Sequence, residues 1–373
     1  MEIPALNIRH RRPQVLYPQI TKSPYFPRTE EAGAIEYYDY NHTYWPIDYG
    51  RDPAEEYQAI HERVVMMDVG CQRSVELRGP DALNFADYLC ARNLKTMKVG
   101  RARHTAICEP NGVLYCEALV MKLAEDRVWI CHGPVDLTQW SGAILAHSDF
   151  DVEVTRTQVY PFAVQGPRSY DIMQELVPEA ADMKFFRWIK TTVAGVESIV
   201  IRSGYSGAFG YEVFPFDPAE ALRTWDAVAD AGKQYDVMVS PMIGPFFERG
   251  VTDWTYGDDL DLNPFEARLE RAMNLDAGPF VGKEALQRIA EAGPERKLVG
   301  IRFGPGAEIP PIEQFWPIED GSGLVTRVEQ SWYLGEPIGS AVVAADTELD
   351  REVQVRHPEG VATGRLVALP FMD

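Results

Sequence analysis

Hydrophobic and polar residues alternate along the chain in patterns that predict a mixture of helices and strands. Asp52 is a capping residue type and Pro53 suits a first turn, so a helix is predicted over residues 53–68. Asn111-Gly112 lies in a predicted turn at 109–112 between two strand-like runs within 103–123, which indicates a β-hairpin. Other segments with helical patterns are 80–89, 134–146, 167–176, 218–233 and 282–292, and other strand-like runs are 71–77, 127–132, 150–155, 193–203 and 210–216.

The pattern changes near residue 290. From Leu298 onward the chain consists almost entirely of short strands and turns, which predicts a small all-β C-terminal domain over 291–373. The interleaved helices and strands of 36–290 indicate an α+β body of two interleaved domains. Residues 1–30 are rich in proline and basic residues without clear periodicity, so an extended N-terminal arm is expected over 1–35.

Composition narrows the class of partner. The 373 residues include 56 acidic and 36 basic ones, a net charge of −20, and 46% are hydrophobic. An acidic surface repels phosphate backbones and anionic lipid, so neither nucleic acid nor a membrane surface is an expected partner. The charge is compatible with attraction of a small cation. The partners expected are a small-molecule substrate and a second copy of the chain in a homo-oligomer. No apolar run suits a signal peptide or a transmembrane helix, so a cytoplasmic location is expected.

The five cysteines form no C-x-x-C pair and the seven histidines show no ligand spacing, so no metal site is predicted. No Rossmann or phosphate-loop fingerprint occurs either, which argues against a nicotinamide enzyme. Reduced and mostly buried thiols are therefore expected.

The stretch from Arg202 to Glu212 carries the most information. Three glycines surround Tyr205 between two predicted strands, and glycine allows a flat ligand to approach the backbone closely. Glu212 follows on a strand that is otherwise apolar. The same pattern is also typical of an ordinary glycine-rich hairpin with an exposed glutamate.

Three further groups of residues are candidates for chemistry. A dense aromatic segment at 37–49 suits a cationic ligand through the quadrupoles of its rings, or simply a packed core. Gln165 and Arg168 flank a strand-to-helix junction that suits an anion, or a surface cap. Glu117 stands among apolar residues after the predicted turn and is a candidate functional acid, or an edge-strand residue facing water.

In order along the chain, these segments resemble the glycine-cleavage T-protein (aminomethyltransferase) superfamily. The matching landmarks are Tyr40-Asn41-His42, Gln165-Gly166-Pro167-Arg168, Arg202 to Glu212, Tyr256-Gly257-Asp258-Asp259, Phe280 to Leu286, Arg296 to Gly300, Gly323 to Thr326 and Pro370-Phe371. Within the superfamily, the stretches Asp68 to Arg73, Gly79 to Leu83 and Phe185-Phe186-Arg187-Trp188 look most like the tetrahydrofolate-dependent demethylases of dimethylsulfoniopropionate.

The resemblance implies a three-domain cloverleaf with a C-terminal β-barrel, tetrahydrofolate as cofactor and methyl transfer to its N5. Carried onto this chain, it makes Glu117 the catalytic group and assigns Glu212, Tyr205, Gln165, Arg168 and Arg249 to the folate. For Gln165 and Arg168, the carboxylate of the substrate is the alternative ligand. It assigns Tyr40, His42, Tyr44, Trp45 and Trp188 to the methyl donor.

Departures from the family pattern leave several activities open. The T-protein pattern has a glutamate where this chain has Ala208, which argues against aminomethyl transfer to give methylenetetrahydrofolate. Glu117 is one methylene longer than the aspartate it matches. The non-catalytic folate-binding subgroup carries a cysteine in its glycine-rich motif, whereas this chain has Tyr205. The expected activity is demethylation of a sulfonium or quaternary amine; O-demethylation of methoxylated aromatics, aminomethyl transfer and non-catalytic folate binding stay as alternatives.

Overall fold

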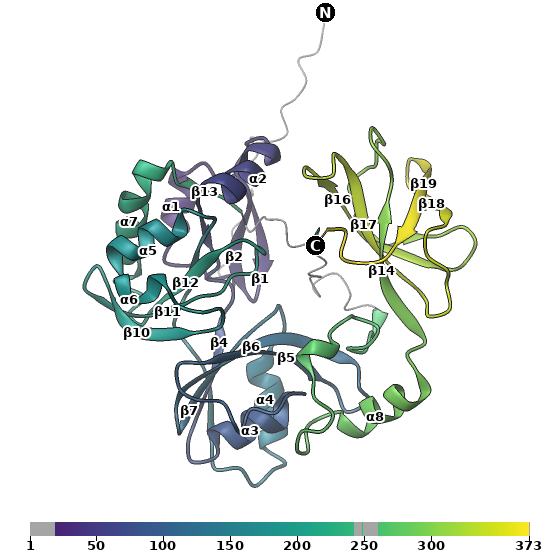
Figure 1. Cartoon of the computed structure of the whole chain (residues 1–373). Coiled ribbons are helices and arrows are strands. Elements are labelled where there is room, and N and C mark those ends of the chain that lie inside the picture. The colour runs from purple at the N-terminus through teal and green to yellow at the C-terminus, as the bar shows by residue number, and fades with distance from the viewer. Residues whose placement is uncertain (1–18, 242–247, 249–259, 373) are drawn as a thin grey trace, which may run out of the picture. The chain divides into compact units, whose positions relative to one another are not determined.

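The structure is a computed structural model that describes residues 19–241, 248 and 260–372 (Figure 1). The chain forms two compact units. Unit 1 comprises residues 1–83, 97–103 and 119–245, and unit 2 comprises residues 84–96, 104–118 and 246–373. Each unit is described by itself. Helices and sheets occur together in the pattern that the sequence predicts, so the α+β fold class is confirmed.

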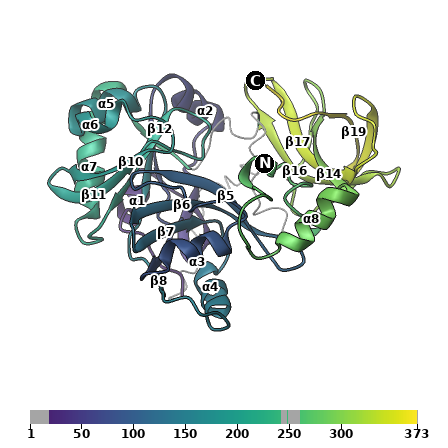
Figure 2. The same cartoon turned by 60° about the horizontal axis from the view of Figure 1, so that its bottom comes forward.

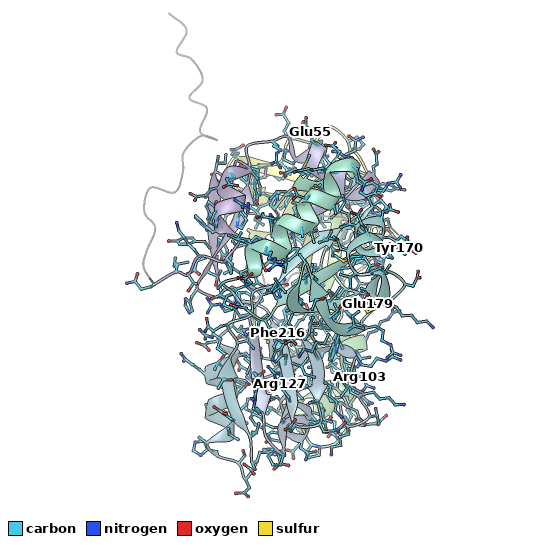
Figure 3. The ribbon with its side chains drawn as sticks, turned by 90° about the vertical axis from the view of Figure 1, so that its left-hand side faces the viewer. Glu55, Arg103, Arg127, Tyr170, Glu179 and Phe216 are labelled. Carbon is cyan, nitrogen blue, oxygen red and sulfur yellow. The ribbon has the colours of Figure 1, made fainter. Side chains whose placement is uncertain are left out.

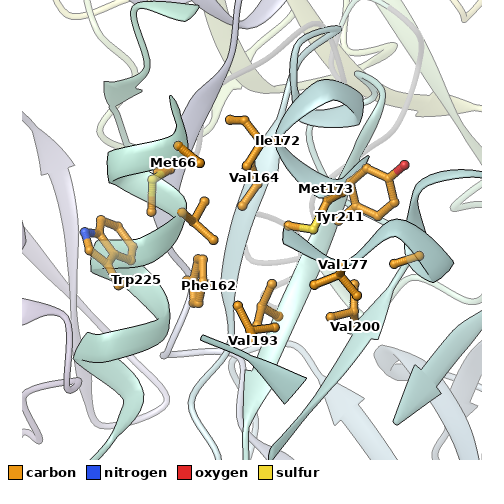
Figure 4. Packing of buried hydrophobic residues seen from close by; sticks show 14 of the residues in the cluster. Met66, Phe162, Val164, Ile172, Met173, Val177, Val193, Val200, Tyr211 and Trp225 are labelled. Carbon is orange, nitrogen blue, oxygen red and sulfur yellow. The ribbon is translucent and has the colours of Figure 1, made fainter. Parts of the chain in front are cut away.

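A six-stranded sheet forms the centre of unit 1. Its order is β10-β11-β12-β9-β3-β13, antiparallel except for the parallel pair of β13 and β3. Hydrophobic side chains from this sheet and from its helices form one core that includes Val164, Ile172 and Trp225 (Figure 4). The strands are β3 (Val65–Asp68), β9 (Phe162–Gln165), β10 (Trp188–Val193), β11 (Val196–Ile201), β12 (Gly210–Pro215) and β13 (Met238–Val239). The helices are α5 (Ser169–Leu176), α6 (Pro178–Ala181), α7 (Ala221–Gly232) and the short 3-10 helix η2 (Lys233–Tyr235).

The helix predicted over 53–68 is wrong in its second half. Helix α2 spans Pro53–Glu62, and the Asp52 carboxylate accepts a hydrogen bond from the Ala54 N–H at 3.0 Å, as a helix cap does. The residues of β3 pair instead with β9 and β13. They are buried throughout, which is typical of a central strand covered on both faces and cannot be distinguished from a helical turn by periodicity.

The prediction of an extended N-terminal arm is wrong for the part of residues 1–35 that forms a helix. Residues Phe26–Glu31 form helix α1 rather than extended chain. The Phe26 ring stacks on Tyr37 at a centroid distance of 4.7 Å, so aromatic packing holds this helix against the next element. That element is a two-stranded hairpin of β1 (Glu36–Tyr40) and β2 (Thr43–Asp48).

A third sheet has the order β5-β6-β7-β4-β8. The hairpin predicted within 103–123 is confirmed as β5 (Ala102–Cys108) and β6 (Leu114–Ala124), two strands that begin in one unit and end in the other.

Helix α4 (Leu137–Leu145) lies against β8 (Glu153–Arg156) (Figure 2). Arg127 and Phe216 both flank the buried Trp129 ring (Figure 3). The remaining elements are α3 (Ala82–Leu89), β4 (Ser74–Arg78) and β7 (Arg127–His132).

The C-terminal part of unit 2 is a small antiparallel barrel, as the sequence predicts. Its six strands have the order β15-β16-β17-β14-β19-β18, and a bridge between Ile318 and Val355 links the two edges, so the barrel is nearly closed. The strands are β14 (Arg296–Arg302), β15 (Trp316–Pro317), β16 (Gly323–Ser331), β17 (Glu336–Ala344), β18 (Glu352–His357) and β19 (Gly360–Val367). Helix α8 (Lys283–Ala292) and the short η5 (Glu270–Ala272) precede it.

All five cysteines are free, and four of them are buried, as expected. Among the described helices, none has both the length and the apolar character that crossing a bilayer requires.

Candidate functional site

Gln165 organises the glycine-rich connection between β11 and β12. It ends β9, and its side chain is completely buried. The side-chain amide nitrogen donates to the Ser203 carbonyl at 3.0 Å and to the Tyr211 carbonyl at 3.2 Å, and the amide oxygen accepts from the Ser206 hydroxyl at 2.7 Å. The connection therefore folds around Gln165. Contact between this side chain and folate stays a prediction.

Glu212 is buried on β12, and only one of its two carboxylate oxygens accepts a hydrogen bond from the described residues. Its exposed fraction is 7%, and its Oε2 accepts a hydrogen bond from the Ser203 hydroxyl at 2.5 Å. No other hydrogen bond reaches this carboxylate from the part of the chain that the structure describes, so Oε1 is open to a further donor. Burial raises the pKa of Glu212 above its ordinary value. The alternative of a glycine-rich hairpin with an exposed glutamate is therefore wrong, because Glu212 is buried.

Glu117 forms a pair with His104 in unit 2. His104 comes from β5 and Glu117 from β6, and the distance between His104 Nε2 and Glu117 Oε2 is 2.6 Å. Both side chains are partly accessible, with exposed fractions of 35% and 24%. The His104 carbonyl also accepts a hydrogen bond from the Arg92 guanidinium at 2.8 Å, which fixes the backbone of this strand. A carboxylate in contact with an imidazole can hold and pass on a proton.

The sequence analysis did not single out His104 and missed this pair. A signal for it was present, because His104 lies five residues before the predicted turn 109–112 and Glu117 five residues after it. In a hairpin, residues at similar distances from the turn lie near each other on the two strands.

The aromatic segment divides between the two faces of the β1–β2 hairpin. Tyr40 and Trp45 share one face, with ring centroids 5.5 Å apart, and Tyr38 contacts the same indole. Tyr44 is buried on the other face, against Phe26. The cage predicted from the sequence therefore keeps Tyr40 and Trp45 together and separates them from Tyr44.

The turn of this hairpin is Asn41-His42. Both residues have positive φ, 52° and 54°, as a two-residue type I′ turn requires. The Asn41 side-chain amide donates to the Cys71 carbonyl at 3.1 Å and to the Gly133 carbonyl at 3.0 Å. His42 is exposed at the tip. Asn41 therefore fastens the aromatic hairpin to two neighbouring loops.

Four predicted site residues remain: Trp188, Arg168, Tyr205 and Arg249. Trp188 is buried in a hydrophobic cluster, and its indole N–H donates to the Arg101 carbonyl at 3.0 Å. Arg168 is largely exposed and pairs with Asp171 at 3.2 Å. Tyr205 is half-buried in the glycine-rich connection, and Arg249 lies outside the described residues. The assigned roles of these four residues stay predictions.

Comparisons with known proteins identify the family. The family model described as the GCVT N-terminal domain matches residues 25–277, and the glycine cleavage T-protein C-terminal barrel domain matches residues 296–373. The chain belongs to the glycine cleavage T-protein family. Among relatives of this T-protein-family chain, a dimethylsulfoniopropionate demethylase from Ruegeria pomeroyi is 31% identical over 304 residues, 80% of this chain and 82% of the relative. An aminomethyltransferase from Halalkalibacterium halodurans is 28% identical over 95% of this chain and 98% of its own length.

The fold of this T-protein-family chain agrees with the family assignment. The glycine cleavage system aminomethyltransferase of Bartonella henselae superposes with a TM-score of 0.81 at 19% identity, covering 95% of this chain and 98% of that one. Members of the family are tetrahydrofolate-dependent methyl or aminomethyl transferases, and tetrahydrofolate is the cofactor.

Glu212 fits that cofactor. The pterin ring of tetrahydrofolate has an amide-like edge with an amino group and a ring N–H, which are both hydrogen-bond donors. A buried carboxylate with an unused oxygen accepts such donors strongly, because the competing water is excluded. The free acceptor oxygen of Glu212 is thus complementary to the donors of the pterin edge, and binding of folate there stays a prediction.

Proposed function

We propose that this T-protein-family chain is a tetrahydrofolate-dependent demethylase, which transfers a methyl group from a small methylated donor to N5 of tetrahydrofolate. The donor is a sulfonium, such as dimethylsulfoniopropionate, or a quaternary amine. The observation that carries the proposal is Ala208. Where the T-protein pattern has a glutamate, the side chain of Ala208 packs against a hydrophobic cluster that includes Ile60 and Met67. Alanine supplies no carboxylate at that position for aminomethyl transfer.

Glu117 is the acid–base group in this proposal. When bound, tetrahydrofolate supplies a ring nitrogen that is nucleophilic in its unprotonated form. Glu117 takes up at Oε1 the proton that methylation of that nitrogen releases, while Oε2 keeps its contact with His104 Nε2. His104 orients the carboxylate and passes the proton on toward solvent, to which both side chains are partly open.

The aromatic face of the β1–β2 hairpin supports a cationic donor. The buried Tyr40 and the half-buried Trp45 pack edge to face, and the quadrupoles of such rings attract a sulfonium or ammonium centre. A donor of this kind leaves as a neutral thioether or amine, so its departure needs no proton. The relative from Ruegeria pomeroyi, which is named for its action on dimethylsulfoniopropionate, supports the same class.

His104 favours a second candidate, O-demethylation of a methoxylated aromatic. An ether leaves as an alkoxide or phenoxide and needs a proton or a hydrogen-bond donor at the oxygen. The His104–Glu117 pair can deliver a proton, so the same residues suit this chemistry.

The test is incubation of the purified chain with tetrahydrofolate and one donor at a time: dimethylsulfoniopropionate, glycine betaine or a methoxybenzoate. Formation of 5-methyltetrahydrofolate with one of the first two supports the proposal. Turnover of the methoxybenzoate alone establishes the second candidate. Formation of methylenetetrahydrofolate from an aminomethyl donor, with no methyl product from any of the three, replaces both with aminomethyl transfer.

A further inference from the structure

Arg73 is a buried guanidinium to which the described residues supply no carboxylate partner. It lies between β3 and β4, and its exposed fraction is 7%. Its Nη2 donates to the Tyr160 hydroxyl at 3.2 Å, and its guanidinium carbon lies 5.1 Å from the centroid of the same ring. Within the described ranges, its buried Nε has no hydrogen-bond partner, and no acidic side chain forms an ion pair with the guanidinium.

This arrangement is costly unless an anion completes it. A buried charge without a counter-charge loses its hydration and recovers little from a phenol. Burial lowers the pKa of Arg73, and the neighbouring Arg156 lowers it further. Arg156 has its own partner, Asp136, at 3.0 Å, so that acid already serves another arginine. The surroundings of Arg73 are therefore electropositive, and among the described residues no acidic side chain neutralises its charge.

The loop that ends at Arg73 accepts a hydrogen bond from the turn of the aromatic hairpin. The Arg73 backbone N–H donates to the Cys71 carbonyl at 2.9 Å, and Asn41 of the hairpin turn donates to that same carbonyl. Asn41 also donates to the Gly133 carbonyl, and the Tyr40 hydroxyl lies 3.8 Å from the position that a Cβ on Gly133 would take. The Arg73 backbone and the turn next to Tyr40 therefore meet at the Cys71 carbonyl, within unit 1.

We propose that Arg73 binds the carboxylate of the methyl donor. The inference rests on the proposed demethylase function and makes the substrate class narrower: a methylated compound with a carboxylate a few bonds from its methylated centre. The planar guanidinium fork matches a carboxylate with two parallel hydrogen bonds, and the unused Nε is one of its donors. A cationic centre on the same donor then faces Tyr40 and Trp45.

Binding to simple probes tests Arg73 independently of catalysis. Isothermal titration calorimetry compares propionate with propionamide, and benzoate with benzamide, on the full chain. We expect the wild type to bind each carboxylate and not its amide, and Arg73→Gln to bind the carboxylates about 30-fold more weakly or worse. Arg223→Gln, which removes an exposed arginine paired with Glu220, serves as the matched control and should bind like the wild type.

Stability separates binding from a structural role. Because a buried unpaired charge is removed, Arg73→Met should unfold at the same temperature as the wild type or higher. A wild type that does not distinguish carboxylate from amide overturns the proposal, as does unchanged carboxylate binding by Arg73→Gln. Should Arg73→Gln fail to fold, Arg73→Lys replaces it. Because lysine lacks the planar guanidinium, we expect Arg73→Lys to bind the carboxylates several-fold more weakly, and unchanged binding overturns the proposal.

The two proposals fail in different ways. Methyl transfer from a carboxylate-free donor as fast as from its carboxylate analogue overturns the role of Arg73 and leaves the demethylase intact. Carboxylate binding that depends on Arg73, in a chain that transfers no methyl group to tetrahydrofolate, supports the anion site and overturns the demethylase.

Discussion

The side-chain amide of Gln165 occupies the space that a side chain at Gly204 would need. A Cβ built on Gly204 would overlap the Gln165 Oε1 atom, and one on Gly210 would overlap the amide nitrogen. Gln165, which lies on β9 about forty positions earlier in the chain, is therefore the reason that positions 204 and 210 require glycine. The same amide forms hydrogen bonds with the Ser203 carbonyl and the Ser206 hydroxyl, and the Ser203 hydroxyl donates to the Glu212 carboxylate. Gln165 thus positions the candidate folate carboxylate through one intervening serine.

Replacement of Gly204 by alanine should destabilise the protein by about 3 kcal/mol, because the buried amide has no room to move. Chemical denaturation measures this. Gly142→Ala is the control, since a methyl added there on helix α4 meets no described atom within 4 Å beyond its chain neighbours and the helix backbone. It should be neutral or stabilising by up to about 1 kcal/mol. Equal effects of the two substitutions would contradict the packing described for Gln165.

Glu212→Gln should weaken tetrahydrofolate binding by roughly 10- to 100-fold, because an ionised acceptor is replaced by an amide that also presents a donor. Fluorescence quenching or calorimetry measures the affinity. The wild-type affinity should also fall on acidification at a higher pH than an ordinary glutamate would give, since burial raises the pKa of Glu212 and protonation removes the acceptor. Unchanged affinity in the variant would remove Glu212 from the folate site.

Glu117→Gln should lower the rate of methyl transfer by about 100- to 10,000-fold, the usual contribution of a positioned acid–base group, while folate affinity changes little. Single-turnover kinetics with saturating tetrahydrofolate measure the rate. Glu197→Gln is the matched control, since Glu197 is an exposed glutamate paired with Lys190. A Glu117 variant with the wild-type rate would leave the carboxylate with no catalytic role.

Asn41→Gly should destabilise the protein by about 1–2 kcal/mol, because glycine keeps the positive φ of 52° and loses both side-chain hydrogen bonds. Asn41→Ala should cost about 1 kcal/mol more, because alanine is strained in that conformation. Thermal or chemical unfolding of the three proteins gives the order. A glycine variant as stable as the wild type would mean that the two bonds contribute nothing.

His132 gives a pH dependence of stability whose sign is fixed. Burial lowers its pKa from 6.5 to about 4 in the folded protein, where its Nδ1–H donates to the Gly133 carbonyl at 2.7 Å. The stabilisation by neutral His132 is therefore fully present above the unfolded pKa of 6.5 and is lost as pH falls toward 4. His132→Asn keeps a donor but does not titrate. The stability difference between wild type and variant should shrink by about 2 kcal/mol between pH 7.5 and pH 5. A difference independent of pH would contradict the burial of His132.

The elements that the sequence predicted well are those whose signals are local. Asp52 and Pro53 predict where α2 begins, and Asn111-Gly112 predicts the β5–β6 hairpin, because caps and turns depend on neighbouring residues alone. The end of α2 was not predictable in the same way. Val65 joins a strand because β9 and β13 lie beside it, and those partners come about 100 and 170 residues later in the chain.

The candidate site was predictable in its residue types and less so in its connections. Glu117 and Glu212 stand out as acids within apolar strands, and the structure gives each a polar partner. Arg73 was visible only as part of a resembling stretch. Its burial and missing counter-charge depend on how Tyr160 and Arg156 fold over it, which no local pattern contains.

The central claim is transfer of an intact methyl group to tetrahydrofolate, and mass spectrometry of the folate product tests it most directly. The chain is incubated with tetrahydrofolate and a donor whose methyl groups carry three deuterium atoms each, taken in turn from dimethylsulfoniopropionate, glycine betaine and a methoxybenzoate. We predict 5-methyltetrahydrofolate that retains all three deuterium atoms. A methylene product with two deuterium atoms, or no labelled folate with any of these donors, would contradict the account.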